Sequence, residues 1–166
     1  MIQWLNELLY KKILVPYDIS KPADNALEHA LRLEKANPNE TEVIVLHVIP
    51  EIPIYPVIEH AIKTRKDSSL TAFQEHAQYV YSTMKNEVVR ILDEKRRQYE
   101  QVGLKFQTEV VQGKPVDSIL EYAESKGIEL IIMGGTGLSG LAKLTALGSV
   151  SRGVVERSKC PVMIVH

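Results

Sequence analysis

The sequence predicts an α/β fold in which helices cover both faces of a five-stranded parallel sheet. Short apolar segments alternate with amphipathic segments of helical period, in the order β-α-β-α-β-α-β-α-β. This alternation is typical of parallel sheets that are wrapped by helices. The apolar segments are nearly continuous in hydrophobicity, as expected of strands buried on both faces. We expect one domain over residues 1–166, with the strand order 3-2-1-4-5.

The composition is that of an ordinary globular protein and argues against several classes. The net charge of −1, from 20 basic and 21 acidic residues, provides no bulk attraction to nucleic acid or to an anionic membrane. The single cysteine, Cys160, excludes an intramolecular disulfide scaffold. No segment approaches the roughly 20 apolar residues of a membrane-spanning helix, and residues 1–11 lack the pattern of a signal peptide. We expect a cytoplasmic protein whose residues 1–11 form an N-terminal extension.

The first strand and helix are expected at residues 13–36. Residues 13–17 are apolar and predict a buried strand, after which the Ser20 hydroxyl caps a helix that has Pro22 near its first turn. Residues 37–39, Asn-Pro-Asn, end this helix. Its apolar face is formed by Ala23, Ala26, Leu27, Ala30 and Leu31.

The second strand is expected at residues 43–48, and a proline-containing loop follows at residues 50–56. The next element is an amphipathic helix of roughly eight turns, in which Lys95 interrupts the apolar stripe. The stripe consists of Phe73, Ala77, Val80, Met84, Val88, Ile91, Tyr99 and Val102. Residues 104–110 alternate between apolar and polar side chains, which indicates a half-exposed strand.

The last part of the chain is expected to hold two helices and two strands. Pro115 lies at the start of a helix, and residues 130–133 form the fourth strand. A final helix begins at about Ser149 and directs Val150, Val154 and Val155 inward. Pro161 precedes the last strand, residues 162–165, at a position where a missing amide donor is tolerated.

A glycine-rich stretch, residues 133–153, follows the fourth strand and contains the candidate site. In open α/β sheets, ligands bind beyond the carboxyl ends of the strands, where the strand order reverses. With the order 3-2-1-4-5 that crevice lies between the first and fourth strands. The loop at residues 16–20 and the glycine-rich stretch therefore meet there.

Two familiar phosphate motifs do not account for this stretch. Gly135, Gly137 and Gly140 match the dinucleotide pattern G-x-G-x-x-G, but the next strand ends at His166 without the acidic residue that binds a ribose. The P-loop pattern fails because no Gly-Lys-Ser or Gly-Lys-Thr triplet exists. We interpret the dinucleotide match as accidental.

A third pattern is compatible with an anion-binding cradle. Gly134-x-x-Gly137 is followed, after ten residues, by Gly148-Ser149 at the start of a helix. Glycines allow backbone amides to approach phosphate oxygens, and a helix N-terminus adds free N–H groups with partial positive charge. This pattern predicts a site for the phosphates of a ligand.

The pattern resembles the nucleotide-binding members of the universal stress protein family, in archaea and bacteria, whose motif is G-x-x-G, nine residues, then G-[ST]. The resemblance extends from Lys12 onward and includes residues 13–18, 46–48, 113–115 and 161–165. It implies a Rossmann-like fold of the adenine nucleotide alpha hydrolase type. The spacer here, residues 138–147, has ten residues instead of nine.

The resemblance also implies a set of site residues for ATP, or for AMP or ADP. Asp18, with Pro16 beside it, would bind the nucleoside, and Val48 would offer backbone groups to adenine. The ribose and first phosphate would lie near Met133 and Gly134. The polyphosphate, bridged by Mg²⁺ or Mn²⁺, would be held by Gly137, Gly148, Ser149 and Val150. No protein ligands for a metal are implied.

Alternatives remain for individual residues and for the function. Asp18 could serve only as a turn or cap residue, and His47, within an apolar strand, is interpreted as a hydrogen-bonded core histidine. The resemblance implies a nucleotide-dependent regulatory module and a homodimer formed through the last strand. With no base placed to activate water, strong catalysis is not expected. The alternatives are a weak ATPase or phosphotransferase, or a dimeric interaction protein that binds no nucleotide.

Overall fold

The computed structural model describes the chain except for residues 1–9, 37, 39, 52–67 and 137–146. Its sheet has the strand order β3-β2-β1-β4-β5, and the paired strands are parallel, so the predicted topology is confirmed. The strands are β1 (Lys12–Pro16), β2 (Glu42–Pro50), β3 (Gln107–Gly113), β4 (Leu130–Gly134) and β5 (Val162–Val165). The helices of the described residues are α2 (Lys21–Ala36), α4 (Ser68–Glu100), α5 (Pro115–Lys126) and α6 (Ser149–Arg157).

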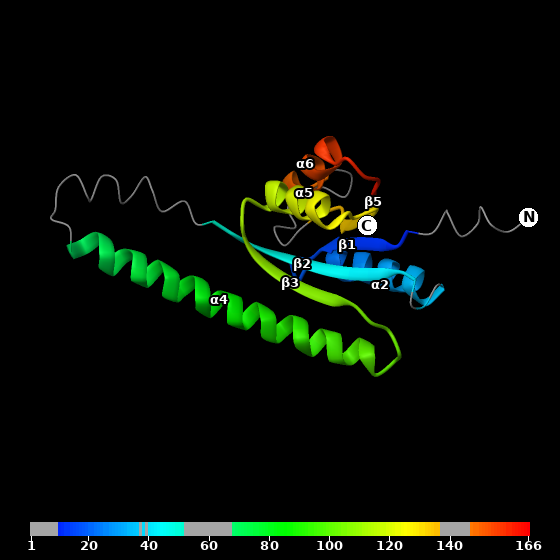
Figure 1. Ribbon diagram of the computed structural model, residues 1–166, viewed down its shortest axis with the longest axis horizontal. Coiled ribbons are helices and arrows are strands. Elements are labelled where there is room, and N and C mark those ends of the chain that lie inside the picture. Colours follow the sequence, from blue (N-terminus) through cyan, green and yellow to red (C-terminus); the bar gives the residue numbers. More distant parts are fainter. Residues whose placement is uncertain (1–9, 37, 39, 52–67, 137–146) are drawn as a thin grey trace, which may run out of the picture.

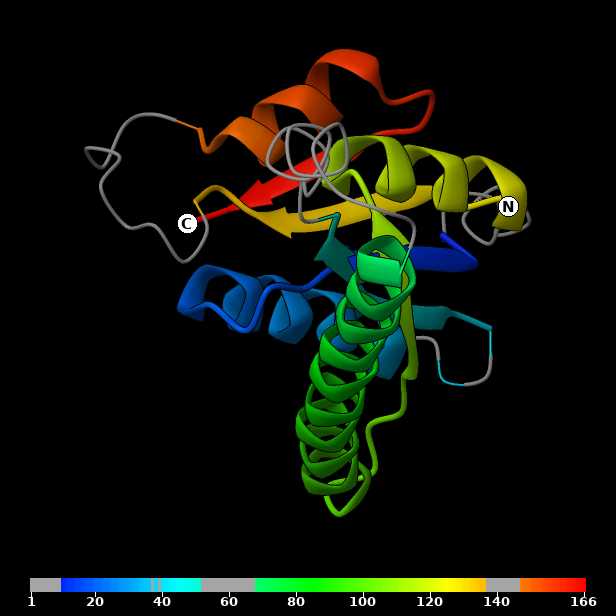
Figure 2. The ribbon, with the colours of Figure 1, turned by 90° about the vertical axis from the view of Figure 1, so that its left-hand side faces the viewer.

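Helices cover both faces of the sheet, as predicted (Figure 2). Because side chains alternate along a strand, β1 contributes to two separate cores. Ile13 and Val15 belong to the core beneath α2 and α4, whereas Leu14 belongs to the core beneath α5 and α6. All three side chains are fully buried. Burial on both faces of the sheet explains why consecutive residues of β1 are apolar in the sequence.

The helix boundaries follow local signals in the sequence. The Ser20 hydroxyl accepts a hydrogen bond of 3.3 Å from the Ala23 amide, so the predicted cap of α2 is confirmed. Pro115 begins α5, and Gly127, with φ of 63°, ends it in the left-handed conformation. One prediction for α6 is wrong: Val154 is fully buried, but Val155 is 43% exposed because the apolar face of this short helix is narrow.

The long helix α4 starts earlier than its predicted stripe and packs over a shorter length (Figure 1). Val88 and Leu92 are buried against the sheet, whereas Met84, one turn earlier, is 41% exposed. Val102, predicted to lie in the stripe, follows the helix and is 69% exposed. Gly103 adopts a φ of 79°, and its amide bonds to the Glu100 carbonyl, which ends the helix at this point.

The third strand begins three residues later than predicted. The Leu104 amide bonds to the Tyr99 carbonyl as part of the helix end, so Leu104 is not available to the sheet. Phe106 is buried and packs edge-on against Tyr99, with ring centroids 5.9 Å apart. Pairing with β2 starts only at Gln107.

Lys95, the polar interruption of the α4 stripe, forms a network with two residues near the start of the chain. Its ammonium group pairs with Asp24 of α2 and lies 5.3 Å from the ring centroid of Tyr17. The Tyr17 hydroxyl donates to the same carboxylate. Burial alone would raise the pKa of Asp24, but the hydrogen bonds from Lys95 and Tyr17 outweigh it and hold the pKa below its usual value. This network joins α4, α2 and the end of β1.

Some predicted features fall on residues that the structure does not describe. Residues 1–9 of the predicted extension, and Pro53 and Pro56 of the predicted loop, lie outside the described residues. Within the described part of the chain, no helix combines the length and the hydrophobicity needed to cross a membrane.

The Lys95–Asp24–Tyr17 network generates a first prediction. Asp24→Asn is expected to lower the free energy of unfolding by roughly 1–3 kcal/mol at pH 7, because Lys95 and Tyr17 lose their shared carboxylate. Because the folded-state pKa of Asp24 is lowered, its stabilisation is present above the unfolded-state value of about 4 and is lost as the pH falls through the folded-state pKa. The two proteins should therefore converge in stability under acid, as measured by urea unfolding.

Asp93→Asn is the matched control, because Asp93 pairs with a more exposed arginine, Arg96, on the same helix. It should change the free energy of unfolding by less than about 0.5 kcal/mol. Equal urea midpoints for Asp24→Asn and the unaltered protein at pH 7 would contradict the assigned role of the network.

Candidate functional site

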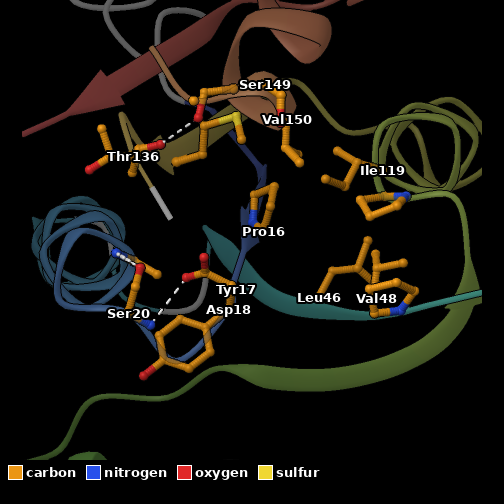
Figure 3. Close-up of a pocket in the computed structure, with 17 residues that line it drawn as sticks. Pro16, Tyr17, Asp18, Ser20, Leu46, Val48, Ile119, Thr136, Ser149 and Val150 are labelled. Atoms are coloured by element: carbon orange, nitrogen blue, oxygen red, sulfur yellow. Dashed lines mark hydrogen bonds between the residues drawn. The ribbon is translucent and has the colours of Figure 1, made fainter. Parts of the chain in front are cut away.

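A cavity of about 380 Å³ lies at the carboxyl ends of the central strands. It lies where the strand order reverses between β1 and β4, as expected for an open α/β sheet. The structure brings eight of the nine predicted site residues to its wall, and Gly137 lies outside the described residues. The eight are Pro16, Asp18, Val48, Met133, Gly134, Gly148, Ser149 and Val150 (Figure 3).

The cavity has an apolar end that the sequence prediction covered only in part. Leu46 and Val48 of β2 line it together with Ile119 of α5 (Figure 3). Leu46 and Ile119 were not predicted. The period of two along β2 could have identified Leu46, which shares a face with Val48. Ile119 could not be placed in this way, because it comes from a helix whose orientation depends on packing.

The polar end is formed by the start of α6. Gly148 is the N-cap, and it offers no side chain to bond the first amides of the helix. Its own N–H donates to the Gly135 carbonyl at 2.8 Å, and its carbonyl accepts from the Arg152 amide. The backbone groups of Gly148 are therefore already hydrogen-bonded, and its role is to place the start of α6 beside the turn after β4. The amides of Ser149 and Val150 belong to the first turn of the helix, where N–H groups lack intrahelical partners. These amides give the polar end a partial positive charge.

A second hydroxyl residue ties this helix to β4. The Ser151 side chain donates a hydrogen bond of 2.9 Å to the Gly134 carbonyl. Thr136, which the sequence prediction missed, also lines this end of the cavity. Thr136 lies two residues after the predicted site residue Gly134, and this closeness in sequence was the available signal.

Asp18 lies in a tight turn between β1 and α2. Its carboxylate accepts a hydrogen bond of 3.1 Å from the Ser20 amide, so the turn role considered from the sequence is present. The same side chain lines the cavity, and only one carboxylate oxygen takes part in that bond (Figure 3). Between them Ile19 has a φ of 68°, a conformation that costs a residue with a Cβ roughly 1–2 kcal/mol.

Tyr17 and His47 support this turn from the opposite face of the sheet. Tyr17 is buried beside α2 and α4, and its ring points away from the cavity (Figure 3). The His47 Nδ1 lies 2.8 Å from the Tyr17 carbonyl, which accepts its hydrogen. Burial lowers the pKa of His47, so its imidazole is neutral at pH 7. The interpretation of His47 as a hydrogen-bonded histidine is confirmed.

The cavity wall carries little charge. Among its described residues, Asp18 is the one with a formal charge at pH 7. In the part of the chain that the structure describes, no group of three or more His, Cys, Asp or Glu side chains could hold a metal ion. The arrangement offers an apolar end, a carboxylate that can accept hydrogen bonds from hydroxyl groups, and a helix terminus that attracts an anion.

The two glycines at the polar end differ in what the fold demands of them. A Cβ on Gly134 would lie 2.7 Å from the Pro22 Cβ and 2.8 Å from the Pro22 carbonyl carbon, so the close packing of α2 on β4 requires glycine. A Cβ on Gly148 would meet its nearest described atom, the Gly135 oxygen, at 3.5 Å, an ordinary contact. Gly148 also has an extended conformation that any residue can adopt.

Comparison with known proteins reveals one family. The model of the universal stress protein family matches residues 9–166. Universal stress protein MJ0577 of Methanocaldococcus jannaschii is 33% identical over 168 residues, which cover 95% of this chain and 96% of the relative. Universal stress protein YxiE of Bacillus subtilis is 34% identical over 162 residues, or 95% of this chain and all of the relative.

Solved structures agree with the fold described above. That of hypothetical protein MJ0577 superposes with a TM-score of 0.75 at 31% identity, covering 95% of this chain and 96% of the other. Two more distant structures share the fold at 24% and 18% identity, with TM-scores of 0.56 and 0.57. The first is a universal stress protein in complex with cAMP, and the second is a family member from Arabidopsis thaliana with AMP bound. They cover 95% and 93% of this chain, and 98% and 90% of the respective structures.

The contrast between the two glycines predicts the effect of one substitution at each. Gly134→Ser should lower the free energy of unfolding by roughly 1–3 kcal/mol, because its side chain must displace Pro22 and Ala23. Gly148→Ser should leave stability unchanged or raise it by a few tenths of a kcal/mol, because serine is a good N-cap. Thermal and urea unfolding of both variants measure the difference. Equal destabilisation of the two would refute the distinction.

Proposed function

The chain belongs to the universal stress protein family, and on that premise we propose that it binds an adenine nucleotide in the cavity between β1 and β4. In this proposal the protein acts as a nucleotide-dependent regulatory module in a stress response. The main observation in favour of nucleotide binding is that one cavity contains an apolar end, a carboxylate and a helix N-terminus without a side-chain cap.

The chemistry of the wall fits the three parts of a nucleotide. Leu46, Val48 and Ile119 provide apolar surface for the base. The free oxygen of Asp18 can accept hydrogen bonds from ribose hydroxyls, and the first amides of α6 can bind phosphate oxygens. The volume of about 380 Å³ lies within the range of small-molecule sites. Bound cAMP and AMP in two family members support adenine as the base.

The position of Gly148 supports phosphate binding despite the longer spacer. Its amide bonds to the Gly135 carbonyl at 2.8 Å, so the start of α6 lies beside the turn after β4. The ten-residue spacer therefore does not separate Gly148 from Gly134. We propose ATP as the ligand, with AMP or ADP as the alternatives, and Mg²⁺ or Mn²⁺ entering with the phosphates.

A regulatory role is favoured over catalysis by the residues around the cavity. In the described part of its wall, Asp18 is the one carboxylate, and one of its oxygens already bonds to the Ser20 amide. Activation of water requires a base within hydrogen-bond reach of the attacking oxygen. Slow hydrolysis is compatible with this arrangement, but no described residue of the wall favours rapid turnover.

We also propose a homodimer formed through β5. This strand lies at the edge of the sheet and pairs with β4. Its side chain Met163 is 41% exposed, and exposed apolar edge strands require a covering partner. A second copy of the same strand would provide that cover.

Nucleotide binding is tested by calorimetric titration of ATP, ADP and AMP into the purified protein. Asp18→Asn and Gly148→Ser should each weaken binding at least about tenfold, which corresponds to about 1.4 kcal/mol. Asparagine retains the acceptor for the Ser20 amide but loses the charge. Serine at position 148 offers its hydroxyl to the amides that would bind phosphate.

Both variants should unfold within about 0.5 kcal/mol of the unaltered protein, so weaker binding would not reflect lost structure. Asp117→Asn is the control, because Asp117 pairs with the exposed Arg157 outside the cavity. Absence of a binding signal for all three nucleotides would contradict the proposed function and favour an interaction protein.

The dimer is tested by Met163→Glu. A carboxylate at this exposed position of β5 would be desolvated between two copies, so sedimentation should change from dimer to monomer. Val155→Glu is the control, because Val155 has similar exposure, 43%, on α6. A monomeric unaltered protein, or a dimer that tolerates Met163→Glu, would refute this interface.

A further inference from the structure

The turn that presents Asp18 to the cavity contains an unfavourable backbone conformation. Ile19 is β-branched and has a φ of 68°, in the left-handed region that such residues rarely adopt. Its side chain is 38% exposed, so its own burial does little to offset the strain. Strained conformations persist where neighbouring interactions over-determine them, and they concentrate at functional sites. The interactions that hold this turn are therefore of functional interest.

The hydrogen bonds that hold the turn have different origins. The bond from the Ser20 amide to Asp18 and that from the Ala23 amide to Ser20 are local and would move with the turn. Two others come from β2: the Tyr17 amide donates to the Leu46 carbonyl at 2.9 Å, and the His47 Nδ1 donates to the Tyr17 carbonyl at 2.8 Å. That carbonyl belongs to the peptide group that joins Tyr17 to Asp18. The His47 bond therefore fixes the orientation of this peptide relative to the sheet.

His47 has no place in the cavity wall itself. His47 lies two residues after Val45 on β2, so its side chain points to the same face of the sheet, the face covered by α2 and α4. Val48 points to the other face and lines the cavity. Tyr17 is also on the α2 and α4 face, where its ring is fixed by Asp24. The ring contact anchors the side chain, but the carbonyl needs its own partner because Tyr17 is only 3% exposed.

We propose that His47 is a positioning residue that holds the strained turn after β1 and thereby keeps the Asp18 carboxylate at the cavity. Without the imidazole donor the buried Tyr17 carbonyl loses its partner, and the turn relaxes from the conformation that Ile19 resists. The role of Asp18 toward a ligand rests on the proposed function. The holding of the turn does not, because it is a property of the protein without ligand.

Two substitutions at position 47 test whether the hydrogen bond, and not another property of histidine, holds the turn. His47→Asn keeps an amide N–H close to the position of Nδ1, and His47→Leu removes the donor while filling the space. The readout without ligand is hydrogen exchange of the Ser20 amide, which donates to Asp18. We expect His47→Leu to accelerate this exchange roughly tenfold, as loss of one buried hydrogen bond implies. His47→Asn should restore most of the protection.

A substitution at Ile19 tests the strain directly. Glycine adopts the left-handed conformation without steric strain, so Ile19→Gly removes the strain that drives the turn to relax. In the double variant with His47→Leu, the Ser20 amide should therefore regain protection relative to His47→Leu alone. Titration with ATP should follow the same order, with His47→Leu weakened about tenfold and both His47→Asn and the double variant closer to the unaltered protein.

The outcomes distinguish this inference from the proposed function. If the unaltered protein binds no adenine nucleotide, the proposed function fails, and the Ser20 exchange still decides whether His47 holds the turn. Exchange in His47→Leu equal to that of the unaltered protein would overturn the inference. Faster exchange with unchanged ATP affinity would also overturn it, because Asp18 would then not depend on the turn. If His47→Leu does not fold, His47→Met removes the donor with a more adaptable side chain.

Discussion

The alternation of side chains at the end of β1 places two consecutive residues in different environments. Tyr17 continues the core beneath α2 and α4, whereas Asp18 lines the cavity on the other face. The Tyr17 ring is fixed by Asp24, which in turn is paired with Lys95 of α4. The carboxylate that faces the candidate ligand is therefore supported by a polar network on the far side of the sheet.

The cavity follows from the topology more than from any single motif. Parallel strands end at the same edge, and the reversal of strand order between β1 and β4 separates the helices that cover the two faces. Residues more than 100 positions apart, such as Asp18 and Ser149, thereby line one cavity. The glycines have different functions within it. Gly134 permits α2 to pack closely on β4, while Gly148 leaves the first turn of α6 without a side-chain cap.

Features encoded over short stretches could be predicted from the sequence, whereas those set by distant contacts could not. The strand order and the Ser20 cap follow from periodicity and from turn chemistry. Eight of the 17 residues that line the cavity were expected from the family resemblance. Lys95 was recognised only as an interruption, because its partner Asp24 lies 71 residues away. The exposure of Met84 and Val155 depends on which part of each helix meets the sheet. The φ of Ile19 contradicts the preference of its residue type, so no local signal predicts it.

The separation of the core into two layers limits how a change in one layer can affect the other. The sheet between them is continuous, and most of its side chains belong to one layer only. At the edge nearest the cavity, Tyr17 and Ala23 are exceptions: both belong to the core beneath α2 and α4, and both also line the cavity. No described residue of α4 lines the cavity, so substitutions on this helix do not contact a ligand there directly. The two layers therefore meet at the cavity through the turn after β1 and the start of α2, and the imidazole of His47 holds the first residue of that turn.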